Sequence, residues 1–197
     1  MIFDFETEYE LENDAVLLRP LKLSDLDNLI SFAITEPELW KYSIDAIAGE
    51  KNFKIYIEKA IDGRVQQKDY PFIVFDKRKG KYAGSTRFYD IQINNAALKI
   101  GYTWYGKDFQ GTGLNKNCKY LLLEFAFEKM KMNRVAFEAN NNNQKSIAAM
   151  KSIGCTVEGV LREVVLNYDG TKRDNIILSI LKKEWDDSVK DNLRTRL

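Results

Sequence analysis

The sequence predicts an α/β (α+β) protein built on a mixed, mostly antiparallel sheet with helices on both faces. Three observations support this class. Segments rich in β-branched and aromatic residues alternate with segments whose apolar residues recur at helical spacing. Several strand segments are joined by short turns, as in antiparallel hairpins. Helices and hairpins also alternate along the chain, which favours a sheet covered on two sides.

The first half of the chain is predicted to contain one strand, two helices and one hairpin. Residues 15–19 read as a short strand that Pro20 stops. Ser24, followed three residues later by Asp27, is typical of a helix start, and an apolar stripe runs from there to Ala33. The other elements of this half are a helix at 51–65 and a hairpin with strands at 71–75 and 82–91.

The second half begins with a strand at 97–104 that runs into glycine-containing sequence, and a helix follows from Leu114. Gly154 is expected to end a short helix at 144–153, as glycine commonly does. Asp169-Gly170 is a strong hairpin turn. The remaining elements are strands at 134–139, 156–168 and 172–181 and a loosely packed charged helix at 182–197. The predicted order is β-α-α-β-β-β-α-β-α-β-β.

Length and composition narrow the class of protein. The 197 residues, 45% of them hydrophobic, predict one domain over residues 1–197 with a substantial core. The 30 basic and 29 acidic residues nearly cancel, which argues against nucleic acid or an anionic membrane surface as a partner. The apolar runs are too short to span a bilayer, and the acidic N-terminus is unlike a signal peptide.

The histidine and cysteine content limits the types of catalytic and metal site that the chain can form, and it indicates the cellular compartment. The chain has no histidine, which excludes a histidine base and most zinc and non-haem iron sites, so no metal is expected. Its two cysteines, Cys118 and Cys155, fit buried thiols in a reducing compartment better than a disulfide. We therefore expect a cytoplasmic protein.

The strand-to-helix junction at residues 109–116 is the strongest functional signal in the chain. It reads Phe-Gln-Gly-Thr-Gly-Leu-Asn-Lys. The N-terminus of a helix offers unpaired N–H groups and a partial positive charge, and glycine allows a phosphate to approach closely. The junction therefore predicts a site for a phosphorylated ligand, although a plain turn could look similar.

Two motifs and the order of elements resemble the GNAT superfamily of acetyl-CoA-dependent N-acyltransferases. The superfamily loop reads Gln/Arg-x-x-Gly-x-Gly/Ala, and Gln110-Gly111-Thr112-Gly113-Leu114-Asn115 matches it except at the last place. Residues 143–155, from Asn143 and Ser146 to Cys155, resemble the superfamily's Asn-x-x-Ser helix. Residues 158–162 and 169–174 are similar to the branch that acetylates N-termini of ribosomal proteins. The resemblance covers about residues 15–185.

The resemblance implies acetyl-CoA as cosubstrate and assigns residues to bind coenzyme A. Backbone N–H groups of residues 111–115 would hold the pyrophosphate, and Asn115 would still donate although it fills space that glycine leaves free. Tyr102, Thr103 and Trp104 would pair by their backbone with the pantetheine arm, and one of their N–H groups would stabilise the oxyanion. Asn143 and Ser146 would contact the cofactor, although Asn143 could instead only cap its helix.

The catalytic residues are less well defined by the same resemblance. Glu138, five residues before Asn143, is the candidate base, or else a solvated residue of the sheet. Lys99 occupies another place where relatives carry a glutamate, and Met150 replaces the tyrosine that often protonates the leaving thiolate. The substitute acids are Tyr102, Tyr105 and Tyr168. For Cys155, a buried apolar role is favoured over a nucleophilic one.

The acceptor is expected to be a primary amine of a small molecule, an amino acid or a peptide N-terminus. The aromatic residues that could line its site are Trp40, Tyr42, Phe88, Tyr89 and Tyr168. Two other functions remain open: a coenzyme-binding module without catalysis, and a phosphate-binding protein of another class. The long final strands would also allow a homodimer.

Overall fold

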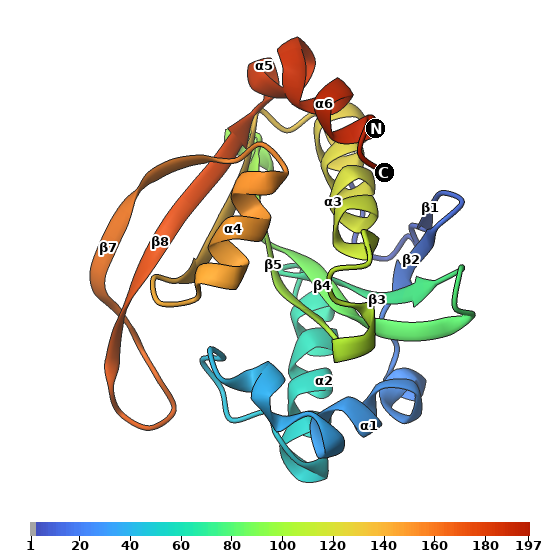
Figure 1. Ribbon diagram of the computed structural model, residues 1–197, viewed down its shortest axis with the longest axis vertical. Coiled ribbons are helices and arrows are strands. Elements are labelled where there is room, and N and C mark those ends of the chain that lie inside the picture. The colour runs from blue at the N-terminus through green and yellow to red at the C-terminus, as the bar shows by residue number, and fades with distance from the viewer. Residues whose placement is uncertain (1–2) are drawn as a thin grey trace.

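The computed structural model describes residues 3–197, which form one eight-stranded sheet with helices on both faces (Figure 1). The strands lie in the order β1-β2-β3-β4-β5-β6-β8-β7, and every neighbouring pair is antiparallel except β5 and β6. The strand bounds are β1 Leu11–Glu12, β2 Val16–Pro20, β3 Tyr70–Asp76, β4 Lys81–Gln92, β5 Ala97–Tyr105, β6 Arg134–Asn140, β7 Thr156–Leu166 and β8 Lys172–Leu181.

Two pairs of longer helices cover the sheet, one pair from each half of the chain. The α-helices are α1 Leu26–Thr35, α2 Glu50–Val65, α3 Leu114–Glu124, α4 Gln144–Ser152, α5 Lys182–Glu184 and α6 Lys190–Arg194. Short 3-10 turns are η1 Leu23–Asp25, η2 Pro37–Trp40, η3 Ile93–Asn95 and η4 Lys107–Phe109, and π turns are η5 Phe125–Lys129 and η6 Trp185–Val189.

Side-chain alternation along the strands divides the buried residues into two cores. Phe72 and Phe88 belong to the larger core, which includes residues of α3 and α4. Ile73 and Trp104 point to the opposite face and join the smaller core, which includes residues of α1 and α2. Because successive residues of a strand point to opposite faces, one strand serves both cores. Residues on these two faces are referred to below as lying on the α3 side and on the α2 side.

The sheet opens between β5 and β6. These strands are parallel partners only over Ala97–Lys99 and Arg134–Ala136. Beyond Lys99, β5 continues for six more residues without pairing to β6. The opening therefore leaves the backbone from Ile100 to Tyr105 free of a strand partner on that side.

The element order predicted from the sequence is confirmed, with local differences. The sequence reading missed the two-residue strand β1 and the 3-10 and π turns. It was also wrong about Ser24 as the helix cap, because η1 precedes α1 and the capping carboxylate belongs to Asp25. That carboxylate accepts a 2.9 Å hydrogen bond from the Lys22 N–H and pairs with Arg19.

The predicted loosely packed C-terminal helix is wrong in a more important way. Residues 182–194 pack against α3 and its π turn, because Trp185, Val189 and Leu193 recur every four residues on one face. Trp185 is fully buried, and its ring stacks on Phe127 at 5.5 Å between centroids. In residues 3–197, no helix has the length and apolar character needed to cross a membrane.

Candidate active site

The loop between β5 and α3 has the geometry of an anion-binding site. Gly111 and Gly113 have φ angles of +74° and +85°, which other residues rarely adopt, and Gly113 is the N-cap of α3. A side chain at Gly111 would meet nothing within 4 Å, and one at Gly113 would meet only Arg78. The outer surface of the loop is thus open, and the first turn of α3 presents its N–H groups there.

Side chains hold this loop in place from two directions. Gln110 donates from Nε2 to the Tyr105 carbonyl at 2.7 Å, and Thr112 donates from Oγ1 to the Phe109 carbonyl at 2.8 Å. Lys145, in the first turn of α4, donates to Oε1 of Gln110. The N-termini of α3 and α4 are thereby brought next to each other, and the sequence prediction placed the coenzyme at both.

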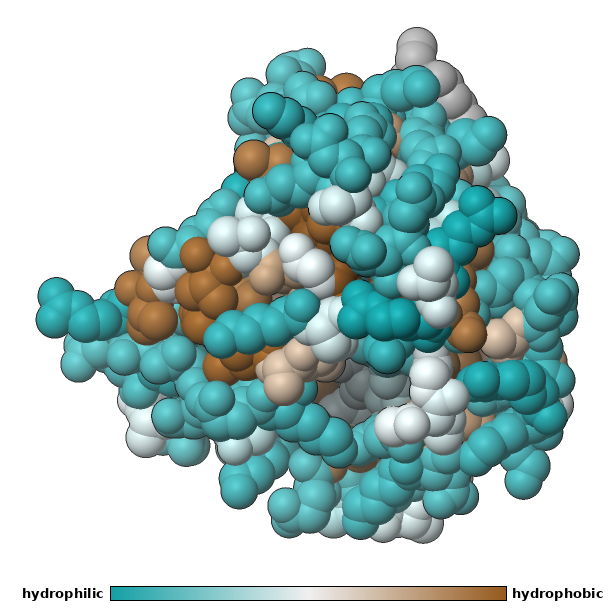
Figure 2. Space-filling view, turned by 45° about the horizontal axis from the view of Figure 1, so that its top comes forward, coloured by the Kyte–Doolittle hydropathy of each residue, from teal (hydrophilic) through white to brown (hydrophobic). Residues whose placement is uncertain are grey.

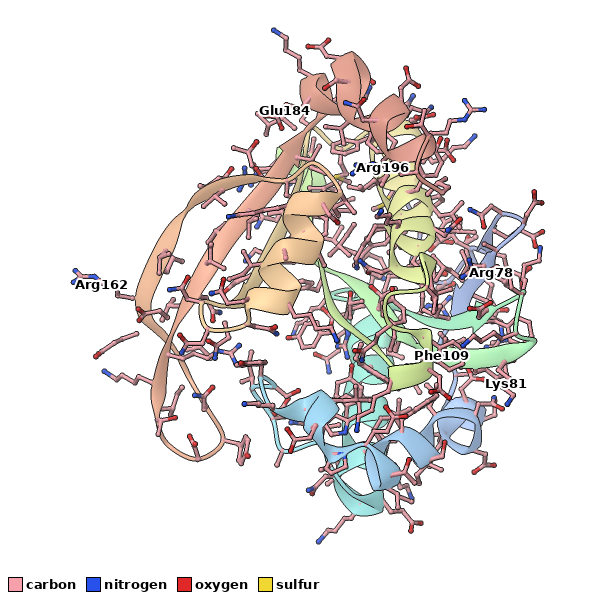
Figure 3. All side chains as sticks on the ribbon, viewed as in Figure 1. Arg78, Lys81, Phe109, Arg162, Glu184 and Arg196 are labelled. Carbon is pink, nitrogen blue, oxygen red and sulfur yellow. The ribbon has the colours of Figure 1, made fainter. Side chains whose placement is uncertain are left out.

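Arg78 is a further cation at this loop that the sequence reading missed. It comes from the turn between β3 and β4, and its guanidinium donates to the Thr112 carbonyl at 3.2 Å (Figure 3). Its partner Asp76 is fully buried, while the arginine side chain remains 42% exposed. Nothing in the sequence signals this contact, because 34 residues separate the two partners.

A β-bulge shapes β5 at the residues predicted to bind pantetheine. Tyr102 and Thr103 together face Thr86 of β4, because the register shifts between the pairs Arg87–Gly101 and Ser85–Trp104. Tyr102 adopts a φ of +49°, which is uncommon for a residue other than glycine. The bulge lies beyond the point where β5 and β6 cease to pair, so the strained residue is beside the opening.

Tyr102 and Thr103, the two neighbouring residues of the bulge, have side chains on opposite sides of the sheet. On the α2 side, the Tyr102 ring lies 4.0 Å from the Arg87 guanidinium and 5.2 Å edge-on from Tyr89. Burial raises the pKa of Tyr102, so its hydroxyl stays protonated at neutral pH. Thr103 bonds instead to Lys119 on the α3 side, and Trp104 is buried in the smaller core.

The predicted cofactor residues of α4 are found at its N-terminus. Asn143 caps the helix by accepting a 3.1 Å hydrogen bond from the Ser146 N–H, which confirms the capping role weighed for it. Met150 is buried in the larger core. Burial raises the pKa of Cys155 to about 12, so it is a neutral thiol and the buried apolar role favoured for it is confirmed.

Glu138 is held on the α2 side by two partners from neighbouring strands. Its Oε1 accepts a 2.6 Å hydrogen bond from Asn175 Nδ2, and its Oε2 lies 3.4 Å from Lys99 Nζ. Lys99 also pairs with Asp90 at 3.2 Å. Only 21% of the Glu138 side chain is exposed, so it is not the solvated sheet residue that the sequence also allowed.

The aromatic residues predicted to line the acceptor site are not all on one side. Phe88 was assigned wrongly, because it points to the α3 side and stacks on Phe125 within the larger core. Trp40 and Tyr168 do line one small pocket of about 150 Å³, together with Asp45. Tyr42 and Tyr89 are half-buried, and Tyr89 lies against Gly101 on the α2 side.

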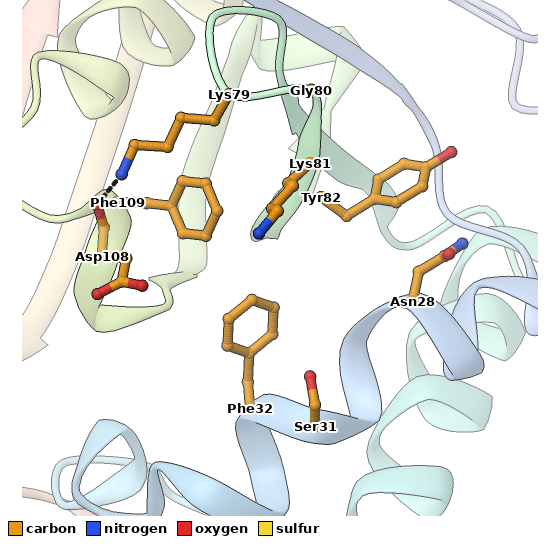
Figure 4. A pocket seen from close by; sticks show the side chains of 9 residues that line it. All are labelled: Asn28, Ser31, Phe32, Lys79, Gly80, Lys81, Tyr82, Asp108 and Phe109. Carbon is orange, nitrogen blue, oxygen red and sulfur yellow. Dashed lines mark hydrogen bonds between the residues drawn. The ribbon is translucent and has the colours of Figure 1, made fainter.

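A second pocket is lined by residues outside β6 and the facing part of β5. It has a volume of about 700 Å³ and is bounded by α1, the β3–β4 turn and η4 (Figure 4). Phe32 and Phe109 form its apolar wall, and Lys79 crosses it to donate to the Asp108 carbonyl at 2.6 Å. In the described part of the chain, no group of three or more Cys, Asp or Glu residues is placed to hold a metal ion.

Comparison with known proteins places this geometry among acetyltransferases. The family model described as "Acetyltransferase (GNAT) domain" matches residues 15–156. A relative from Bacillus subtilis (strain 168), "Putative ribosomal N-acetyltransferase YdaF", is 35% identical over 107 residues. That alignment covers 54% of this chain and 57% of YdaF, little more than half of each.

Solved structures of similar proteins extend the likeness over nearly the whole chain. A "putative acetyltransferase" from T. thermophilus has a TM-score of 0.86 and 30% identity, covering 95% of this chain and 96% of that one. Mycobacterium smegmatis RimJ in complex with CoA-disulfide has a TM-score of 0.78 and 19% identity, covering 95% and 93%. The second comparison shows a shared fold.

Proposed function

The chain belongs to the GNAT family of acetyltransferases, which use acetyl-CoA, and from this premise we propose that it acetylates a primary amine of a small molecule, an amino acid or a peptide N-terminus. The observation that carries the proposal is the opening between β5 and β6 beside the glycine loop. There, the unpaired edge of β5 and the N-terminus of α3 lie close together along the chain. A long phosphorylated cosubstrate needs both, the edge for its extended arm and the helix N-terminus for its phosphates.

Coenzyme A would be held by the groups around the loop. The N–H groups of residues 111–115 would hold the pyrophosphate at the open side of the loop. Tyr102, Thr103 and Trp104 would bind the pantetheine arm through their backbone, and one N–H of the bulge would stabilise the oxyanion. Asn143 and Ser146 would complete the site at the start of α4.

Glu138 is our proposed base for the acceptor amine, acting directly or through one water. It lies on the same side of the sheet as the Tyr102 ring, and Asn175 and Lys99 fix its orientation. The amine would attack the thioester carbon, and the carbon–sulfur bond would then break. An α-amine, with a reference pKa of roughly 7.7–8.0, needs less help from a base than a lysine at about 10.4.

The acceptor is proposed to enter on the α2 side. Support comes from the small pocket lined by Trp40 and Tyr168, where the Asp45 carboxylate, paired with Lys59 at 3.2 Å, has one oxygen left for an ammonium group. The near-neutral formal charge of +1 argues against a polyanionic acceptor. The ribosomal assignment in the name of YdaF is a candidate for this chain only at the level of a peptide N-terminus.

The test combines binding and turnover. Calorimetry should detect acetyl-CoA binding, and a thiol-release screen across amines, amino acids and N-terminal peptides should find an acceptor. Glu138→Gln should lower kcat roughly 10- to 100-fold while leaving acetyl-CoA binding unchanged. Asp90→Asn is the matched control, because it also removes a carboxylate from Lys99. Unchanged kcat in Glu138→Gln would remove Glu138 as the base.

A coenzyme-binding module without catalysis is the second candidate. It is favoured by Lys99 and Met150, which stand where relatives carry acid–base residues. Acetyl-CoA binding without thiol release for any amine would support it, and turnover with a single amine would exclude it.

We also propose a homodimer formed through β7. All eleven residues of this edge strand are exposed or half-exposed, including five large apolar side chains: Val157, Val160, Leu161, Val164 and Leu166. Brown, hydrophobic side chains are gathered at the left of the molecule in Figure 2, and β7 lies on the same side in Figure 1. Exposed apolar patches of this kind mark protein interfaces, and the near-neutral chain would not repel a second copy.

A further inference from the structure

Lys119 is a buried lysine whose ammonium lies over β4 and β5 on the α3 side of the sheet. The residue belongs to α3 and is only 5% exposed. Its Nζ donates to Oγ1 of Thr103 at 2.7 Å and to Oγ1 of Thr86 at 3.3 Å. On the other side, Nζ lies 6.0 Å from the centre of the Phe137 ring of β6. The ammonium is therefore fixed to two strands, β5 and β4, and has a ring of β6 as a more distant neighbour.

This position is next to the opening of the sheet. The last paired residue of β5 is Lys99, four residues before Thr103, so the strands have already separated there. Thr103 is half-buried, whereas Thr86 is fully buried. The ammonium thus lies one hydroxyl group away from the accessible part of the opening, on the side of α3 and the glycine loop.

The charge of Lys119 has no acidic partner to compensate it. Among residues 3–197, no carboxylate forms an ion pair with this ammonium. The titratable groups that influence it are Cys118 on its own helix and Cys155 after α4, and burial raises the pKa of both thiols to about 12, so both are neutral. Tyr105 of β5, next to Cys118, is buried and also neutral.

An uncompensated buried ammonium is unfavourable for folding, so its presence calls for a reason. Burial lowers the pKa of Lys119 to about 8. A leucine or methionine at this position would fill the same space without the cost of removing a charge from water. Groups perturbed in this way gather at functional sites.

We propose that Lys119 is the acid of the reaction, and that its ammonium protonates the sulfur of coenzyme A as the thioester is cleaved. This inference rests on the proposed function. The lone pair of the acceptor nitrogen forms the new carbon–nitrogen bond, and the carbon–sulfur bond breaks with its electrons going to sulfur. A proton passes from Nζ to sulfur, and the neutral Lys119 then regains a proton from solvent. The proton that the amine loses is taken up by Glu138, directly or through one water, and is then released to solvent.

Three features of the site fit this role. An ammonium has three donors, and two are directed by Thr103 and Thr86, which leaves the third for the sulfur. A donor with a pKa of about 8 is closely matched to a thiol with a reference pKa of about 8.5. With this role, Lys119 also provides the proton donor for the leaving thiolate, which Met150 cannot provide. Of the tyrosines considered for it, Tyr168 is 67% exposed and Tyr102 points to the α2 side.

The experiment compares Lys119→Met, Lys119→Arg and the wild-type chain, with Lys183→Met, an exposed lysine of α5, as control. We expect Lys119→Met to lower kcat roughly 100-fold. Its Kd for acetyl-CoA should stay within about threefold of wild type, and its resistance to urea should be equal or greater, because a buried charge is removed.

The pH profile separates a proton donor from a purely structural lysine. Wild-type kcat should fall as the pH rises above about 8, where Lys119 loses its proton. Lys119→Arg, which stays charged, should lack this fall at any residual activity. A kcat of Lys119→Met within threefold of wild type, or the same alkaline fall in Lys119→Arg, would overturn the proposal. Absence of thiol release by the wild type would instead count against the proposed function.

Discussion

At the scale of single residues, the loop between β5 and α3 contains glycines that a sequence motif predicts. It also contacts charged side chains that only folding brings to it. Gly111 and Gly113 adopt the positive φ angles that a tight strand-to-helix turn requires. The motif segment includes both glycines, so their position in the turn could be predicted from the sequence. Arg78 belongs to no motif, and Lys145 occupies an unspecified position of the Asn-x-x-Ser motif, yet both reach the same loop, from a hairpin and from α4. Only folding brings these charges together.

Arg78 offers a direct test of the coenzyme site. Arg78→Ala should raise the Kd for acetyl-CoA roughly 5- to 20-fold, or about 1–2 kcal/mol, because a charge-assisted hydrogen bond to phosphate would be lost. Lys77→Ala is the control, since Lys77 lies on the same turn but pairs with Glu12. Calorimetry measures both variants. Equal Kd values for Arg78→Ala and wild type would show that the arginine holds only the loop.

At the scale of elements, β7 is joined to the sheet by its pairing with β8 and by two ion pairs, of which the exposed one joins Glu163 to Lys172 at 3.3 Å. The Glu158 carboxylate pairs with Arg134 of β6 and accepts a 2.6 Å hydrogen bond from Ser179 of β8. The hydrogen bond from Arg134 lowers the pKa of Glu158 to about 2. Arg162, by contrast, points away from the molecule at the outer edge of β7 (Figure 3).

The Glu158 contact should make stability depend on pH in acid. A carboxyl whose pKa is lower in the folded chain stabilises it above the unfolded value and ceases to do so as the pH falls through the folded value. Between about pH 4.5 and 2, wild type should therefore lose stability that Glu158→Gln lacks at every pH. With 37% of the side chain exposed, we expect about 1 kcal/mol or less.

Urea unfolding between pH 2 and pH 7 measures this difference. Glu163→Gln is the control, because Glu163 lies on the same strand but is 70% exposed. Parallel pH profiles of Glu158→Gln and wild type would contradict the prediction.

The C-terminal segment makes a second prediction at this scale. Trp185 is fully buried against Phe127 and donates from its indole to Glu128 at 3.2 Å. Trp185→Ala should destabilise the chain by roughly 3–5 kcal/mol, because a large cavity is left in the larger core. Leu197→Ala, at a 46% exposed residue, should change little. Similar urea midpoints for the two variants would show that the segment packs loosely after all.

At the scale of the whole molecule, the proposed dimer can be tested without any substrate. Leu161 and Val164 are 48% and 47% exposed on β7, and changing both to Glu would place like charges on both sides of the proposed interface. Light scattering should then report a monomer where wild type forms a dimer. Val65→Glu, at a 77% exposed residue of α2, should leave the dimer intact. If the wild-type protein is still a monomer at high protein concentration, the proposed dimer is wrong.

Most of the fold was predictable because it rests on local patterns. Apolar periodicity, the Asp169-Gly170 turn and Gly154 as a helix end all act over a few residues, and the structure has each of them. The tight C-terminal segment was missed because its many charges outweigh Trp185, Val189 and Leu193 in the sequence. Phe88 was assigned to the wrong face because a strand pattern alone does not say which face belongs to which helices.

The sequence by itself determined the order of elements, the glycine loop and, through two motifs, the family. These features depend on neighbours along the chain, which a sequence displays. The tertiary structure alone decided where β5 leaves β6, that Glu138 meets Lys99 and Asn175, and that the Lys119 ammonium bonds to Thr103 beside the opening. Such contacts join residues far apart in the chain, and their chemistry depends on burial and distance, which only the folded chain defines.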